Sequence, residues 1–320
     1  MNGMKAQILS TATLLVVSCG TLPAVDPRLL NLVMPDAKVL AGVNVTQIKA
    51  SPFGQYLLSQ IQSQSGLDQL ATLTGFDPRQ DINELLAASD AAASGQQGGL
   101  ALATGTFNVA TITAFVAAQN KAVTETYGGV IILEDPKQTH GIAFLSGSLA
   151  VAGDVADVKA AIDRQTTPTP LPAAVIVQVN ALSSAEDVWV LSTVPPSSLH
   201  PPSNTPAIPG LGTGAQGALS NIQQASAGVK FGANVALTIQ AQADNAQDAT
   251  TIVGVLQLLV NMAQLQAQQN ASIAALAQSL AVTSAGTTVT ISASLPEAQF
   301  QQLLQKPHAD AAHSHMHRQN

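Results

Sequence analysis

Apolar and polar positions follow one recurring pattern along this chain of 320 residues. Five segments begin with alternating apolar positions, which are typical of a strand with one buried face. Each then passes through a short polar or proline-containing turn and continues with apolar positions at helical spacing. The pattern therefore predicts a strand followed by a helix in residues 37–62, 99–119, 147–165, 233–259 and 287–306.

Helix start signals stand where the spacing of apolar residues changes from that of a strand to that of a helix. Asn108, Asp154 and Asn245 occupy positions where a side-chain oxygen can accept a hydrogen bond from the first turn of a helix. Pro52 and Pro296 stand at or near first-turn positions, where the missing N–H of proline costs nothing. These residues predict where five helices begin.

A β-hairpin is predicted between the second and third segments. Residues 122–147, "AVTETYGGVIILEDPKQTHGIAFLSG", contain two β-rich runs. A turn at Glu134–Thr139 that contains Asp135 and Pro136 separates the runs.

The order strand, helix, hairpin, helix occurs twice. It spans residues 99–164 and returns as a strand at 229–243, a helical stretch at 247–280, paired strands around Gly286 and a helix from Pro296. This repetition predicts an α+β fold of duplicated split β-α-β units, related to the ferredoxin-like arrangement. The sheet is expected to be mainly antiparallel, with helices packed on it.

The helical stretch at 247–280 is one element or two. Apolar residues at core-facing spacing flank a polar middle, "QLQAQQNAS", and a turn near Asn270 would divide the stretch. The apolar face predicts core helix in preference to a partner-binding groove.

Proline and glycine divide the chain. Residues 195–214 carry six prolines, which can continue neither a sheet nor a helix. The predicted organisation is a leader at 1–24, an N-terminal α+β part at 25–194, a linker or loop at 195–217, a C-terminal β-α-β-β-α unit at 218–306 and a disordered His-rich tail at 307–320. In the alternative, the later strands complete the earlier sheet.

The first 24 residues predict export from the cytoplasm. Lys5 precedes the apolar run "ILSTATLLVV" and small residues follow, as in a secretory leader. Cleavage after Ala24 would release a mature chain, whereas the lipobox-like "VVSC" would place an acyl anchor on Cys19. The two alternatives are evenly balanced. The expected location is the periplasm, the cell surface or the medium, with a membrane contact only through such an N-terminal lipid.

Composition narrows the function classes. Charged residues make up 10% of the chain, aromatic residues 3%, and the net charge is −7. With neither basic clusters nor aromatic stacking platforms, the sequence argues against nucleic-acid binding. Cys19 is the only cysteine, so the chain forms no internal disulfide.

A dinucleotide-binding motif is matched only in spacing. "GTGAQG" at Gly212–Gly217 fits G-x-G-x-x-G, but a proline-rich segment rather than a strand precedes it. No suitably placed acidic residue follows. The segment predicts a hinge before a short helix at 218–225, and no cofactor is expected.

The tail is the one candidate metal site. It holds His308, His313, His315 and His317, whose imidazoles could bind Zn²⁺, Ni²⁺ or Cu²⁺. The spacing lacks the Cys or carboxylate support of a structural zinc site, so a solvated tail is the competing interpretation.

No known catalytic motif is present in the sequence. The densest charged group is Asp77, Arg79, Asp81 and Glu84 in "FDPRQDINELL". This group favours a capped, salt-bridged turn over a functional site. His140 and His200 are the histidines outside the tail. No catalytic residue is assigned.

Three segments resemble a family of uncharacterised exported bacterial proteins: "DPRLLNLVMPDAKVLAGVNVTQIKASPFGQYLLSQI", "LTGFDPRQDINELL" and "GVKFGANVALTIQAQADNAQDATTIVGVLQLL". The resemblance covers about Val25 to Lys306. It implies export, and it carries over no activity, cofactor or functional residue.

The leading hypothesis is a non-catalytic binding or structural module of the bacterial envelope, with an unidentified envelope partner or ligand. One alternative is a periplasmic or surface hydrolase that uses carboxylates. The other is metal binding through the His-rich tail.

Overall fold

The computed structural model describes residues 25–61, 65–90, 98–119, 122–196, 221–266 and 271–305. The strands are β1 (Val39–Asn44), β2 (Ile82–Ser89), β3 (Gly99–Gly105), β4 (Val123–Tyr127), β5 (Val130–Glu134), β6 (His140–Ser146), β7 (Leu149–Asp154), β8 (Val188–Ser192), β9 (Ile222–Lys230), β10 (Asn234–Ala243), β11 (Ala281–Ala285) and β12 (Thr288–Pro296). The helices are α1 (Pro27–Leu30), α2 (Val45–Ala50), α3 (Pro52–Ile61), α4 (Ser65–Thr74), α5 (Pro78–Asp81), α6 (Val109–Ala118), α7 (Val155–Thr166), α8 (Ala173–Ala185), α10 (Ala246–Gln266), α11 (Ala271–Ser279) and α12 (Glu297–Gln305).

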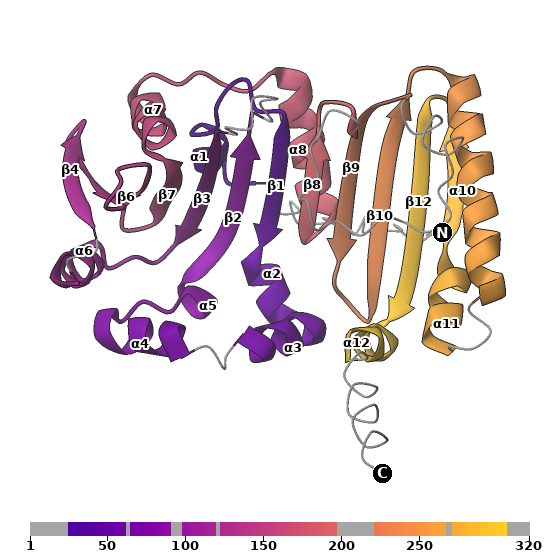
Figure 1. Cartoon of the computed structure of the whole chain (residues 1–320), viewed down its shortest axis with the longest axis horizontal. Coiled ribbons are helices and arrows are strands. Elements are labelled where there is room, and N and C mark those ends of the chain that lie inside the picture. Colours follow the sequence, from indigo (N-terminus) through magenta and orange to yellow (C-terminus); the bar gives the residue numbers. More distant parts are fainter. Residues whose placement is uncertain are drawn as a thin grey trace, which may run out of the picture.

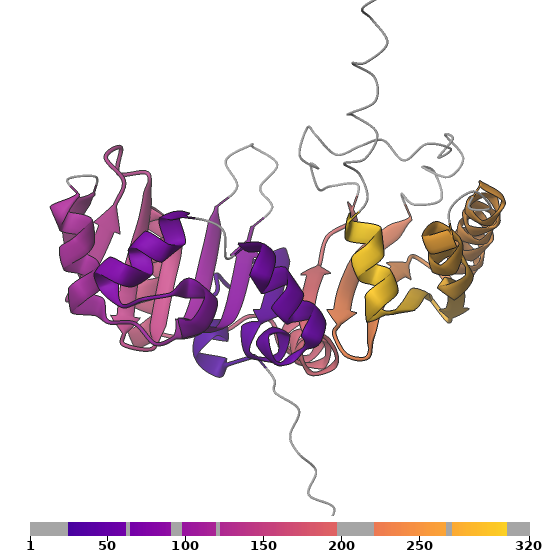
Figure 2. The ribbon, with the colours of Figure 1, turned by 90° about the horizontal axis from the view of Figure 1, so that it is seen from below.

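The strands form one sheet in the order β11-β12-β10-β9-β8-β1-β2-β3-β7-β6-β5-β4 (Figure 1). Every neighbouring pair is antiparallel. Helices pack on both sides of this sheet, and in Figure 2 the yellow α12 and the orange α10 lie on the same side. The predicted α+β class with a mainly antiparallel sheet is confirmed.

The five predicted strand-to-helix segments are confirmed as β1-α2-α3, β3-α6, β7-α7, β10-α10 and β12-α12. The Asn108 side chain accepts a hydrogen bond from the Thr111 N–H, and the Asn245 side chain accepts one from the Asp248 N–H. Asp154 holds the N-cap position of α7 without a side-chain hydrogen bond to it. These caps show that local sequence decides where the helices begin.

Two local predictions are wrong. The first run of the predicted hairpin is two strands, β4 and β5, because Gly128 and Gly129 adopt φ values of 57° and 81° and turn the chain between them. The Glu134–Thr139 turn separates β5 from β6, as expected. The predicted short helix at 218–225 is contradicted, because β9 begins at Ile222 and pairs with both β8 and β10.

The long helical stretch is two helices. Helix α10 ends at Gln266 and α11 begins at Ala271, the residue after Asn270, while residues 267–270 lie outside the described ranges. Strand β12 pairs antiparallel with both β10 and β11, which makes β10 and β11 parallel with one strand between them. This is the split β-α-β arrangement. In the N-terminal counterpart, α6 joins β3 to β4 and three strands lie between those two.

Pairing of β8 with β9 carries the sheet across the predicted domain boundary. Six residues on neighbouring strands pair with one another across the sheet and point to the same side of it, which we call face A. They are Leu86, Gly42, Trp189, Gly228, Thr238 and Ser292. The next row reads Ala87, Ala41, Val190, Ala227, Ile239 and Ile291, and we call its side face B. Successive strand residues alternate between the two faces.

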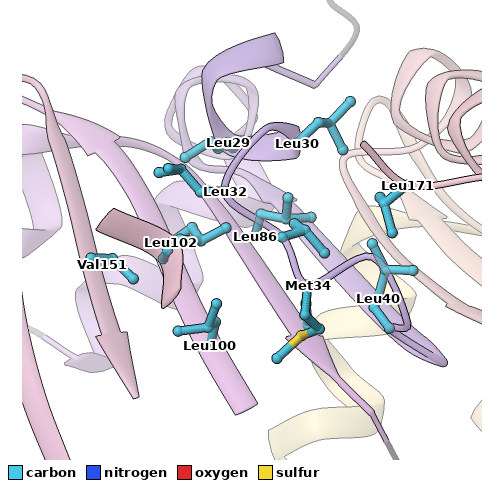
Figure 3. Close-up of a cluster of buried hydrophobic side chains, with 14 of the residues drawn as sticks. Leu29, Leu30, Leu32, Met34, Leu40, Leu86, Leu100, Leu102, Val151 and Leu171 are labelled. Carbon is cyan, nitrogen blue, oxygen red and sulfur yellow. The ribbon is translucent and has the colours of Figure 1, made fainter. Parts of the chain in front are cut away.

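Face A is apolar in the N-terminal half of the sheet. The segment before β1 contributes Leu29, Leu30, Leu32 and Met34, which lie over strand residues such as Leu86 (Figure 3). Helices α7 and α8 add further residues to the same core cluster, namely Val158, Ala161, Ile162 and Val179.

The polarity of the faces reverses beyond β8. On β9, β10 and β12, face A carries Gln, Ser and Thr residues, whereas face B carries Ala, Val, Ile and Leu. Face B is covered there by α10, with Ala249 and Ile252 buried against Val289. The Phe53 ring on α3 packs against the rings of Phe231, which follows β9, and Phe300 on α12, at centroid distances of 5.3 and 5.2 Å.

Candidate functional site

An apolar cavity lies between α10 and face B of the C-terminal strands. Its volume is about 250 Å³. The residues that line it are Pro196, Ile222, Ala225, Ile239, Ala241, Ile252, Leu256, Val289 and Ile291.

The register of three strands leaves this space open. Ala241 on β10 faces Ala225 on β9 and Val289 on β12 in the sheet ladder. Two adjacent alanines make a low floor, and the larger side chains of Ile239 and Ile291 stand beside it. The cavity therefore follows from small residues placed next to each other by strand pairing.

Helix α10 forms the roof. Ile252 and Leu256 are four residues apart and so lie on the same side of the helix. Ile252 is 1% exposed and Leu256 is partly buried. The Asn245 side chain, which accepts from the Asp248 N–H at 3.0 Å, fixes the start of this helix.

The cavity suits an apolar molecule. Its described lining contains neither a charged side chain nor a side-chain hydrogen-bond donor. A cavity lined by Leu, Ile and similar residues stays dry and takes apolar guests, because water there would lose its hydrogen bonds. The described part of this lining offers no acid, base, nucleophile or metal ligand.

The charged group at Asp77 is a capped turn, as the sequence predicts. The Asp77 carboxylate accepts from the Arg79 N–H and caps α5. Arg79 forms ion pairs of 2.8 Å with Asp77 and with Asp68. Glu84 lies apart on β2, where it accepts from the Asp26 N–H.

The Asp77 carboxylate is unsuited to general-acid catalysis. Asp68, Asp77 and Arg79 line a surface hollow of about 480 Å³, together with Lys49. Hydrogen bonding from Arg79 holds the pKa of Asp77 below its ordinary value. A general acid requires the opposite shift, toward the working pH. The Lys49 ammonium donates to the carbonyls of Gln80 and Ile82 and thereby closes the turn.

A carboxyl pair lies under α7. Glu134 is 2% exposed, and the Glu134 and Glu125 side chains share a hydrogen bond. This bond, together with burial, raises the pKa of Glu134. Lys159 forms a 2.8 Å ion pair with Glu125, whose pKa is lowered mainly by that contact. When Glu134 is protonated, its carboxyl group can donate to the Glu125 carboxylate. Neither Glu125 nor Glu134 lines the apolar cavity or the hollow beside Arg79.

Several sequence candidates lie outside the described residues. They are Cys19, the Gly212–Gly217 motif, His200 and the tail histidines His308, His313, His315 and His317. His140 is described: it is an exposed residue of β6 whose Nε2 lies 3.3 Å from the Asp154 carboxylate.

Metal-ligand clusters and membrane-spanning helices are considered for the described ranges alone. Within them, no group of three or more His, Cys, Asp or Glu side chains is arranged to hold a metal ion. None of the helices described there is both long enough and apolar enough to cross a membrane.

Comparisons with known proteins identify a fold. No family model matches the sequence, and no curated protein matches it. Crystal form III of the Treponema protein TP0453 is similar with a TM-score of 0.55 and 10% identity, over 86% of this chain and 96% of that chain. Crystal form I gives a TM-score of 0.50 and 10% identity, over 88% and 98%. At such identities the likeness shows the fold alone, and the resemblance to an exported family stays a prediction.

The carboxyl pair predicts a pH dependence of stability. With a folded pKa above that of an exposed Glu, about 4.3, Glu134 contributes most to stability at acid pH. Its contribution falls as the pH rises from the unfolded pKa through the folded pKa. Glu134→Gln keeps a donor for Glu125 and cannot ionise. We expect this variant to match the native chain at pH 4 and to have a larger free energy of unfolding at pH 8, by urea denaturation.

Glu125→Gln is the matched control. It removes the ion pair with Lys159 and should lower the free energy of unfolding at pH 8. A Glu134→Gln variant that is less stable than the native chain at pH 8 would contradict the protonated pair.

Proposed function

We propose that this protein is a non-catalytic binding module, exported to the bacterial envelope, which holds an aliphatic ligand in the cavity between α10 and face B. The observation that carries the proposal is the lining of that cavity: nine described residues, all apolar, around about 250 Å³. An unfilled apolar hollow costs packing energy, so an occupant of matching chemistry is stabilised there.

The size of the cavity sets the length of chain it can hold. A methylene group has nearly the volume that a water molecule occupies in the liquid, about 30 Å³. About 250 Å³ therefore accommodates roughly eight methylenes. Each buried methylene contributes about 0.8 kcal/mol, which is about fourfold in affinity.

The charged groups of the described chain support binding rather than turnover. Arg79 is paired with Asp77, Lys159 with Glu125, and Lys230 with Asp187 at 2.5 Å. Hydrogen bonding from Arg79 lowers the pKa of Asp77, and that from Lys159 lowers the pKa of Glu125, so these two carboxylates are poor proton donors at neutral pH. The hydrolase alternative would need a pair of carboxyl groups that meet in one cavity, one of them with a raised pKa.

A series of 1-alkanols tests the cavity. Titration of the full chain with 1-hexanol through 1-dodecanol should show the dissociation constant falling about fourfold per methylene. The trend should flatten once the chain exceeds roughly eight carbons, because further methylenes stay in water. Isothermal titration calorimetry gives both the affinity and the negative heat-capacity change of apolar burial.

Ala241→Leu fills the cavity floor. In this variant the dissociation constant should stop falling at an alkanol about three methylenes shorter than in the native chain. Ala236→Leu is the matched control, because it makes the same change on β10 but on face A. Affinities that are independent of chain length, or equal in Ala241→Leu and the native chain when both remain folded, would overturn the proposal.

Export is tested at the N-terminus. Expression of the full precursor in a bacterial host, followed by intact mass measurement, should give either an acylated chain that begins at Cys19 or an unmodified chain that begins at Val25. Recovery of the uncut precursor from the cytoplasm would refute export.

A further inference from the structure

A second hollow, which we call the α8 groove, lies on the opposite side of the same strands. Its volume is about 390 Å³, within the range of small-molecule sites. Helix α8 forms one wall, and face A of β8, β9 and β10 forms the floor. The groove stands where the helices on face A end and the polar part of that face begins.

The lining of the α8 groove combines apolar residues of α8 and β8 with polar side chains that are almost free of charge. Amide side chains come from Gln178 on α8, Gln224 on β9, and Gln240 and Gln242 on β10. Ser and Thr hydroxyls lie between them. Of the described side chains that line the groove, Glu186 alone is ionisable. Nearby Lys230 pairs with Asp187, so the groove presents no lining cation to an anion.

Glu186 is held in a fixed position. It lies over Gly228, where an added Cβ would stand 2.2 Å from the Glu186 Cγ. The Thr238 hydroxyl donates to its carboxyl group, and its own N–H donates to the Leu182 carbonyl at 2.8 Å. Burial raises the pKa of Glu186. A carboxyl group placed in this way keeps acceptor sites directed into the groove.

The amides of the floor are also oriented. Gln224 Nε2 donates to Gln242 Oε1 at 3.1 Å, and Gln242 Nε2 donates to Thr287 Oγ1 at 3.1 Å. These hydrogen bonds set the orientation of both amide groups, because they determine which amide atom contacts the protein. A ligand therefore meets a floor that offers both donors and acceptors at set positions.

We infer that the α8 groove binds a neutral saccharide. Hydroxyl groups donate and accept, as the amides and the Glu186 carboxyl require. An anionic ligand would meet the Glu186 charge without a compensating cation. An aliphatic ligand would desolvate the amides without replacing their hydrogen bonds. The inference does not depend on the proposed aliphatic ligand, since the two sites open on opposite faces of the sheet and share only Ala225 and Ala241 among their described lining residues.

The test uses the full chain and three trisaccharide probes. Maltotriose and tri-N-acetylchitotriose are neutral, and trigalacturonate is anionic. Saturation-transfer NMR detects binding, and calorimetry at pH 7 measures affinity. We expect at least one neutral trisaccharide to bind with a dissociation constant below 10 mM, and more tightly than trigalacturonate.

Two variants locate the binding. Glu186→Ala removes a charge-assisted acceptor and should weaken neutral-trisaccharide binding at least tenfold. Gln240→Ala changes an exposed side chain and should weaken it about twofold to tenfold without affecting folding. Gln257→Ala, on the exposed side of α10, is the control and should leave the affinity unchanged.

Three results would overturn the inference. They are the absence of binding by both neutral probes, unchanged affinity in both groove variants, and tighter binding of trigalacturonate or of the cationic probe glucosamine. Leu256→Phe, at a residue that lines the apolar cavity and not the α8 groove, should keep its saccharide affinity while losing long alkanols, which separates a failure at one site from a failure at the other.

Discussion

The pairing of β8 with β9 is the constraint on which the rest of the structure depends. Strand residues alternate between two faces, so one continuous sheet fixes which residues can share a side. On β8 the buried Leu191 points to face A, and its partner Ser226 on β9 points the same way. The apolar side of the sheet therefore changes from face A to face B at this junction.

This reversal explains why the helices are divided between the faces. Helices α1, α7 and α8 cover the leucine-rich part of face A, whereas α10 to α12 cover the apolar part of face B. Both hollows lie close to the reversal, one under α10 and the other beside α8. The Gln, Ser and Thr side chains that make the α8 groove polar are the outward-facing counterparts of the alanines and isoleucines that make the cavity apolar.

Sequence reasoning recovered what depends on neighbouring residues. The changes from period two to period 3.6 placed five strand–helix pairs, and Asn108 and Asn245 cap helices as expected. It missed β2, because "INELL" follows a strong turn signal and is too short to show a clear period, and it missed α8, whose "AVIVQV" has strong β-propensity. Packing on face A, where Val179 is buried, outweighs that local preference.

The cavity could not be predicted for a different reason. Ile252 and Leu256 were expected to face a core, but the space beneath them exists because Ala241 meets Ala225 and Val289 across strands that are distant in sequence. The period of apolar residues indicates which side chains face the core, but it does not indicate which of those side chains contact one another. The cap at Asp77 was predictable because Asp77 and Arg79 are close neighbours along the chain, whereas the contacts of this turn with Asp68 and Lys49 were not.

The most direct test of the account is where an aliphatic chain binds. In the full chain with labelled methyl groups, intermolecular NOEs from bound 1-decanol would identify the contacting residues. We predict NOEs to the methyl groups of Ile239 on β10 and of Ile252 and Leu256 on α10, which line the cavity. NOEs confined to Leu258 and Met262, which are 60% and 41% exposed elsewhere on that helix, would show that decanol coats a surface and would contradict it.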